Sequence, residues 1–179
     1  TDIAGNAGTA DVADKVANKL TINGTAEVKA ATWDIHFANL SEATLTGTAT
    51  VATAPTLTAT KIGDYKITIV KPGDGVKYTF DVENKGTIDA KLGTFTKPEP
   101  VCTSAGTAEG SAAEAAKVCA GLTYTLTYTD TGTAVKAEDT LAKGETKNLT
   151  LTLSYDSDSV PSNDVEISGL DITMVYNQN

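Results

Sequence analysis

The chain has 179 residues, of which 40% are hydrophobic and only 6% aromatic, and its formal net charge at pH 7 is −9. This length is enough for one domain whose core consists mainly of aliphatic side chains. Arginine is absent from the sequence, and the lysines are not clustered as phosphate binding requires. The composition therefore excludes nucleic acid as a partner.

The first eighteen residues are predicted to be an N-terminal extension, followed by a single β-sandwich domain over residues 19–179. Residues 1–9 have small side chains, with Ile3 as the one sizeable apolar group. Residues 10–20 place Val12, Val16 and Leu20 on one helical stripe behind Thr9, a suitable N-cap. A short helix is therefore expected over residues 10–20.

From residue 20 onward, apolar and polar residues alternate with period two, the pattern of half-buried strands. Threonine, a β-branched strand former, makes up about one residue in six. Strands are expected at residues 20–28, 32–37, 43–59 with a break at Pro55, 65–70, 76–82, 88–95, 122–129, 149–155 and 165–176. In the second of these, Trp33, Ile35 and Phe37 are expected to share one face. Turn signals separate the strands, so the sequence predicts an all-β, jelly-roll-like antiparallel β-sandwich with one or two short helices in insertions.

Cys102 and Cys119 are the only cysteines, and they bound an insertion rich in Gly, Ala and Ser. Residues 108–118 inside it are Ala- and Glu-rich and are expected to form a second short helix. In an exported protein this cysteine pair predicts a disulfide. Two buried thiols in a cytosolic protein are the alternative.

Candidate catalytic groups are scarce in this sequence. His36 is the only histidine, so neither a zinc helix nor a Ser–His–Asp triad is predicted. We therefore predict a protein that is not an enzyme and holds no cofactor. One oxygen-rich loop is a weak candidate for a calcium site, through Asp156, Asp158, Asn163 and Asp164.

Two stretches of the chain resemble the TasA/camelysin group of bacterial exported proteins. The first is IVKPGDGVKYTFDVENKGTIDAKL at residues 69–92, and the second is DITMVYNQN at residues 171–179. The resemblance implies a jelly-roll sandwich, export with removal of a signal peptide, and assembly into biofilm-matrix fibres. A start at Thr-Asp-Ile-Ala rather than Met fits such processing. Some members carry a metallopeptidase label, but the histidines it requires are missing here.

In that group, the N-terminal segment of one subunit adds a strand to the next subunit. The resemblance therefore implies a donor strand formed by Thr1, Asp2, Ile3, Ala4, Gly5, Asn6, Ala7, Gly8 and Thr9. The expected partners are further copies of the chain, together with other matrix or cell-surface components. No membrane-spanning segment is predicted. The alternatives are a monomeric surface adhesion or carbohydrate-binding module, an enzyme, and a subunit of a sheet-like coat.

Overall fold

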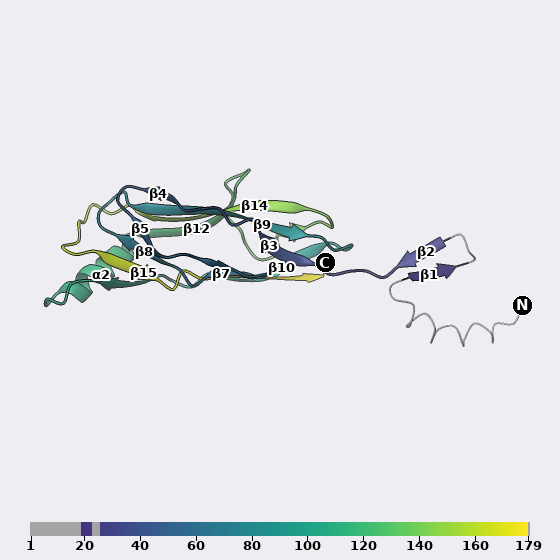
Figure 1. Cartoon of the computed structure of the whole chain (residues 1–179), viewed down its shortest axis with the longest axis horizontal. Coiled ribbons are helices and arrows are strands. Elements are labelled where there is room, and N and C mark those ends of the chain that lie inside the picture. The colour runs from purple at the N-terminus through teal and green to yellow at the C-terminus, as the bar shows by residue number, and fades with distance from the viewer. Residues whose placement is uncertain (1–18, 23–25, 179) are drawn as a thin grey trace, which may run out of the picture.

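The computed structural model describes residues 19–22 and 26–178. Its body is a sandwich of two antiparallel sheets (Figure 1). The first sheet has the order β12 (Leu122–Tyr128), β14 (Thr146–Tyr155), β9 (Gly75–Asn84) and β3 (Ile35–Ala38), and β4 (Thr44–Thr46) also pairs with β9. These elements confirm the predicted all-β class.

The second sheet is built from two runs of strands that continue into each other. One run is β13 (Thr140–Leu141), β10 (Ala90–Thr96), β16 (Ile172–Gln178), β7 (Lys61–Gly63) and β6 (Thr56–Leu57). The other is β11 (Val101–Ser104), β15 (Val165–Ser168), β8 (Lys66–Ile69) and β5 (Thr50–Thr53). Each strand of the second run directly follows or precedes a strand of the first run in the sequence. The sheet therefore consists of long strands, each interrupted between its two halves.

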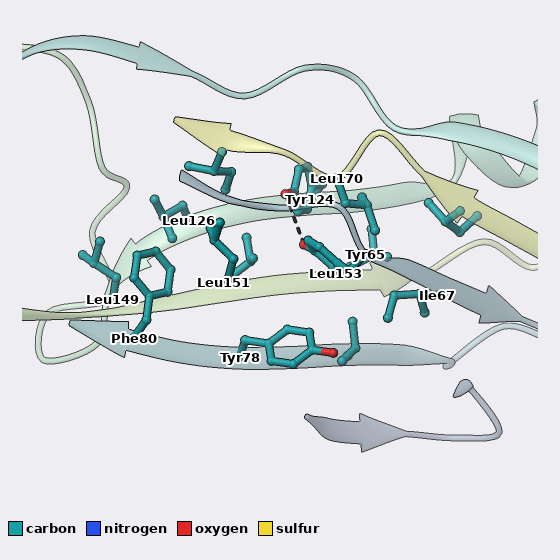
Figure 2. Close-up of a cluster of buried hydrophobic side chains, with 14 of the residues drawn as sticks. Tyr65, Ile67, Tyr78, Phe80, Tyr124, Leu126, Leu149, Leu151, Leu153 and Leu170 are labelled. Carbon is teal, nitrogen blue, oxygen red and sulfur yellow. Dashed lines mark hydrogen bonds between the residues drawn. The ribbon is translucent and has the colours of Figure 1, made fainter. Parts of the chain in front are cut away.

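The core lies between the two sheets and follows the alternation seen in the sequence (Figure 2). In β9, Val76, Tyr78, Phe80 and Val82 are all buried, as predicted. Strand β14 pairs with β9 in a register that places Leu151 beside Tyr78. Burying each such side chain contributes about 1.5–3 kcal/mol, so these two central strands fix which face of the first sheet points inward.

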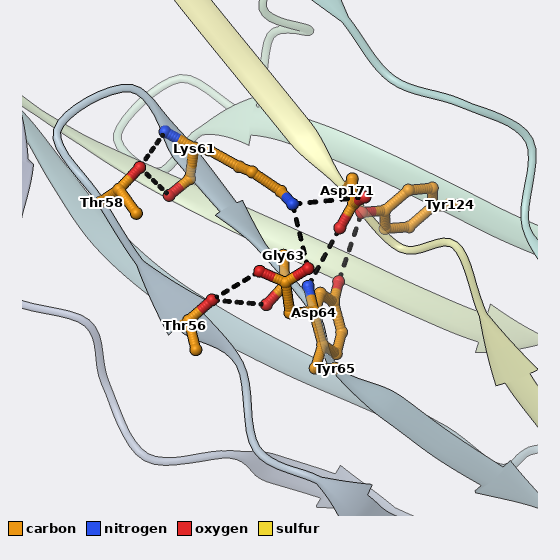
Figure 3. A network of polar contacts seen from close by, with 8 residues as sticks. All are labelled: Thr56, Thr58, Lys61, Gly63, Asp64, Tyr65, Tyr124 and Asp171. Carbon is orange, nitrogen blue, oxygen red and sulfur yellow. Dashed lines mark hydrogen bonds and ion pairs between the residues drawn. The ribbon is translucent and has the colours of Figure 1, made fainter.

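A line of polar residues marks the interruption in the second sheet (Figure 3). Asp64 lies between β7 and β8 with a φ of 60°, and its amide donates a hydrogen bond of 3.0 Å to Asp171 Oδ1. The Lys61 ammonium is 3.0 Å from Asp64 Oδ1 and 3.5 Å from Asp171 Oδ2. Beneath them, the hydroxyls of Tyr65 and Tyr124 are hydrogen-bonded at 3.2 Å and join the two sheets.

The insertion between β11 and β12 contains α2 (Ser111–Ala120), which confirms the predicted second helix with bounds a few residues later. The disulfide between Cys102 and Cys119 is also confirmed, and it ties α2 to β11. Val118 and Ala115 of the helix are buried against the sandwich. No helix among the described residues is long and apolar enough to cross a membrane.

Four predicted segments differ from the structure. The strand expected at residues 43–59 is interrupted at residues 47–49 as well as at Pro55, because Gly47, with a φ of 68°, turns the chain between β4 and β5. The strand expected at residues 20–28 is wrong as a single element, because β1 (Lys19–Ile22) and β2 (Ala26–Lys29) pair with each other, Leu20 opposite Val28. The Asn-Gly dipeptide between them is the hairpin signal that the prediction passed over. The strand at residues 165–176 is divided at Gly169, whose φ is 69°. The helix expected at residues 10–20 lies outside the described residues, except for its last two, which belong to β1.

The fourth difference concerns Trp33. Strand β3 begins only at Ile35, and the Trp33 side chain is 46% exposed instead of joining Phe37 in the core. The hydrogen bonds from Lys85 N to Asp34 O and from Thr87 N to Thr32 O join the preceding segment to the turn after β9. This places Trp33 at the pole of the sandwich where the chain enters it.

Candidate functional site

The nine residues predicted to form a donor strand, Thr1 to Thr9, lie outside the described residues. The sandwich itself does show a groove at one of its lateral margins, where β3 and β4 face β5 and β6. Residues 40–43 line one side of the groove, and Val51, Ala54 and Pro55 line the other. Tyr78 of β9 lines it from the interior. The volume of the groove is about 290 Å³.

The groove exists because the strands on both sides of it are interrupted. Asn39 follows β3 with a φ of 55°, so residues 39–43 leave the direction of the strand before β4 begins. On the other side, Pro55 has no amide hydrogen, and the pairing of β5 and β6 with their neighbours skips Ala54 and Pro55. Two gaps therefore face each other across the margin of the sandwich.

Hydrogen bonds to β9 hold the connection between β3 and β4 in place. The Ser41 amide donates to Thr79 O at 2.8 Å, and the Thr79 amide donates to Ser41 Oγ at 2.9 Å. Asn39 Nδ2 donates to Asp81 Oδ2 at 2.8 Å. Since side chains replace part of the backbone ladder here, the connection stays close to β9 without closing the space above Tyr78.

Tyr78 is the unusual residue of the groove. Its side chain is only 2% exposed. Among the residues that the structure describes, its Oη is the one buried side-chain oxygen or nitrogen without a hydrogen-bond partner. Figure 2 shows this hydroxyl apart from the bonded pair of Tyr65 and Tyr124. Burial raises the pKa of Tyr78 and the Glu42 carboxylate raises it further, so the hydroxyl keeps its proton and remains a donor.

Contacts between the two sheets flank the groove-lining segments along the chain. At one end, the Phe37 amide donates to Ala59 O at 3.0 Å. At the other end, the Asp74 carboxylate accepts hydrogen bonds from four donors: Thr48 N at 2.6 Å, Thr48 Oγ1 at 2.9 Å, Val70 N at 2.8 Å and Lys71 N at 3.0 Å. Burial alone would raise the pKa of Asp74, but these hydrogen bonds outweigh it and hold the pKa below its ordinary value.

The opposite margin of the sandwich is partly covered. Beyond β12, the Val135 amide donates to Leu126 O at 3.1 Å, and the Tyr128 amide donates to Thr133 O at 2.9 Å. The Tyr128 hydroxyl also donates to Asp139 Oδ2 at 2.9 Å. A short extended segment therefore already occupies part of the free edge of β12, in contrast to the groove above Tyr78.

The calcium candidate loop and His36 are the remaining candidates from the sequence, and the calcium site stays a prediction. In the calcium candidate loop, Asp156 accepts a hydrogen bond from Ser154, and within the described part of the chain no three Asp, Glu, His or Cys side chains gather to hold a metal ion. His36 Nδ1 is 2.8 Å from Asp34 Oδ1, and its Nε2 is 3.3 Å from Glu83 Oε2. Its ring is therefore held between two carboxylates on the surface of β3.

Sequence reasoning identified Tyr78 as a core residue but missed its unpartnered hydroxyl. The sequence signal for the groove was Pro55, which lies within a strand-like run and marks a sheet edge that is interrupted. No family model, no curated protein and no solved structure matches the chain.

Proposed function

We propose that this protein is the structural subunit of an extracellular filament or biofilm-matrix fibre. It polymerises head to tail by inserting residues 1–9 as a donor strand into the neighbouring subunit. The observation that carries the proposal is that the described residues before Lys29 add no strand to their own sandwich, because β1 pairs with β2 and not with the body. In Figure 1 this hairpin projects from the pole of the sandwich that also carries the C-terminal strand.

Strand addition is a physically sound way to link such subunits. An inserted segment gains backbone hydrogen bonds along a free sheet edge, and its side chains enter pockets between the sheets. The contact joins two different surfaces, so it does not close on itself and propagates as a fibre. The disulfide supports an oxidising compartment, and the resemblance of residues 69–92 to exported fibre proteins supports the same assignment.

Proline substitutions in the donor segment test the proposal. Ala7→Pro with Gly8→Pro removes two successive amide donors, so one ladder hydrogen bond is lost whichever way the strand faces. The matched control, Ala7→Ser with Gly8→Ala, keeps both donors. We expect electron micrographs to show filaments of the unchanged chain and of the control, and none of the proline variant or of a chain lacking residues 1–9. Filaments from the proline variant and from the shortened chain would refute the proposal.

A second candidate function is a monomeric carbohydrate-binding or adhesion module, which the exposed Trp33 favours. It is the only tryptophan in the chain, and it borders a small pocket of about 90 Å³ together with Tyr176 and Thr60. An exposed aromatic ring beside polar groups is a platform for a sugar face. Because Trp33 is unique, its fluorescence reports directly on glycan binding. A monomer in sedimentation whose Trp33 fluorescence saturates with an oligosaccharide, and whose Trp33→Ala variant binds none in calorimetry, would favour this function over the filament.

A further inference from the structure

We infer that the lateral margin formed by β4, β5 and β6 is a surface at which two copies of the chain associate side by side. Around a two-fold axis, the Leu45 side chain of each copy enters the groove of the other copy. The contact uses none of residues 1–9, so it goes beyond the proposed function and does not depend on it.

Leu45 points toward the inside of the sandwich but is not covered there. In β4 it is the register partner of Val76, which is buried in the core. Residues directly opposite each other in an antiparallel pair point to the same face of the sheet. The Leu45 side chain is nevertheless 46% exposed, because the second sheet ends at β5 on this side. An inward-pointing leucine is therefore left open at the margin.

The groove beside Leu45 can receive one aliphatic side chain. It has a volume of about 290 Å³, and its lining includes Leu40 on one side and Val51, Ala54 and Pro55 on the other. Burial of exposed apolar surface is the main favourable term in the association of proteins. An exchange of Leu45 side chains between two copies fills both grooves and covers both leucines.

Charge favours a second copy of the chain as the occupant. Residues 43–60, which contain β4, β5 and β6, carry no charged side chain and no histidine, although 21% of the chain is charged. Most of these residues are exposed. Two copies with a net charge of −9 repel each other where their carboxylates meet. They therefore approach with least repulsion at a surface that holds no charge, with the exposed Glu42 at its rim.

The other edges of the two described sheets carry protective features. The disulfide ties β11 to α2, a bridge to Ala134 covers part of β12, and β13 has only two residues. On β3, the His36 ring lies between the carboxylates of Asp34 and Glu83. Covers, short strands and charges of this kind prevent sheet edges from associating.

At the margin of β4, β5 and β6, the protection is limited to the backbone. Pro55 and the irregular pairing of β5 with β8 disfavour the addition of a new strand. They do not shield the side chains of Leu45 and of the groove. We therefore assign the contact to side chains. Because the leucine and the groove lie on the same surface, the contact closes as a two-fold dimer and does not propagate.

Cysteine cross-linking tests the contact in full-length chains. Leu45→Cys and Ala54→Cys are made in separate chains, so a disulfide between these two positions joins two copies. Both native cysteines are bonded to each other. We expect a disulfide-linked dimer when the two variants are mixed without reductant. The matched control replaces Ala54→Cys with Ala137→Cys, which is exposed in the segment before β13, and should give at least tenfold less dimer. Equal yields would overturn the inference.

A charge placed at the margin provides a second test. Leu45→Asp and its control Val101→Asp each replace an exposed apolar residue on an edge strand. Both are made in the proline variant at Ala7 and Gly8, which lacks the donor strand. With both proteins folded, as circular dichroism checks, we expect Leu45→Asp to lower the association constant of the dimer in sedimentation at least tenfold. Val101→Asp should leave it unchanged, and equal dimerisation of the two would contradict the inference.

The possible failures are distinguishable. Filaments of the unchanged chain without the dimer of Leu45→Cys and Ala54→Cys would overturn the lateral contact and leave the proposed function standing. The cross-linked dimer without any filaments would overturn the proposed function alone. Oligomers larger than a dimer that Leu45→Asp abolishes would show that the contact propagates, and would overturn its two-fold symmetry. If neither filaments nor the dimer form, both proposals fail.

Discussion

At the residue scale, the Asp74 carboxylate links two segments that are distant in the sequence. Its Oδ1 accepts hydrogen bonds from the Thr48 amide and hydroxyl, and its Oδ2 accepts from the Val70 and Lys71 amides and also from the Thr48 hydroxyl. In Asp74→Asn, the side-chain NH₂ group would replace one carboxylate oxygen. It would face backbone amides that are themselves donors, so their hydrogen bonds would be lost. Since a lost hydrogen bond to a buried charged group costs roughly 1.5–3 kcal/mol, we expect the free energy of unfolding at pH 7 to fall by about 3 kcal/mol. Chemical denaturation measures this, with the exposed Asp130→Asn as control.

The same carboxylate makes stability depend on pH. The pKa of Asp74 is lower in the folded chain than its ordinary value of 3.8. Its contribution is therefore complete above about pH 4 and is lost as the pH falls through the folded pKa. We expect the unchanged chain to lose more stability between pH 5 and pH 2 than Asp74→Asn does. Parallel losses in denaturation curves at these two pH values would contradict this.

Tyr78 and Tyr65 provide a comparison at the same scale. Tyr78→Phe removes a buried hydroxyl that has no partner, so the monomer should keep its stability or gain up to about 1 kcal/mol. Tyr65→Phe should behave in the opposite way, since it leaves the buried Tyr124 hydroxyl unpaired. Melting measurements on both variants check the contrast, and a destabilised Tyr78→Phe monomer would contradict it.

At the element scale, the disulfide is the covalent link between α2 and β11. The helix starts after Gly110, whose φ is 96°, and has no side-chain hydrogen bond at its N-cap. Closing a loop with a sequence separation of 17 contributes about 3 kcal/mol in the chain-entropy model. We expect Cys102→Ser with Cys119→Ser to lower the free energy of unfolding by about that amount. Reductant should lower the stability of the unchanged chain equally and leave the double variant unaffected.

The elements themselves were largely predictable from local signals. Residues 122–128 and β9 alternate cleanly, and the Gly- and Pro-containing turns that flank β9 mark where it begins and ends. The interruption of the second sheet was not predictable, because it depends on the contact between Asp64 and Asp171, which are 107 residues apart. Asp64 adopts a left-handed conformation, which an aspartate predicts less strongly than a glycine would.

The candidate site was even less accessible to sequence reasoning. The alternation in β9 placed Tyr78 in the core correctly, but an unpaired hydroxyl depends on what the opposite elements leave empty. That emptiness arises from residues 39–43 and from Ala54 with Pro55, two gaps that only the fold brings together. The donor role of Thr1 to Thr9 lies outside the described residues and stays a prediction.

At the scale of the whole molecule, head-to-tail assembly gives each subunit one donor and one acceptor. The proline variant at Ala7 and Gly8 lacks the donor but keeps the surface that accepts one, so it should not polymerise alone. It can still accept the donor strand of an unchanged subunit, but it offers none to the next. We therefore expect a trace of the proline variant to shorten the filaments of the unchanged chain.

Filament lengths in electron micrographs, at increasing fractions of the proline variant, measure the outcome directly. Progressive shortening shows that one directional contact accounts for the polymer. As a control, Ala7→Ser with Gly8→Ala should leave the lengths unchanged, because it keeps its donor. Unchanged lengths with the proline variant would mean that a second surface, such as the exposed pole around Trp33 and Val175, also joins subunits.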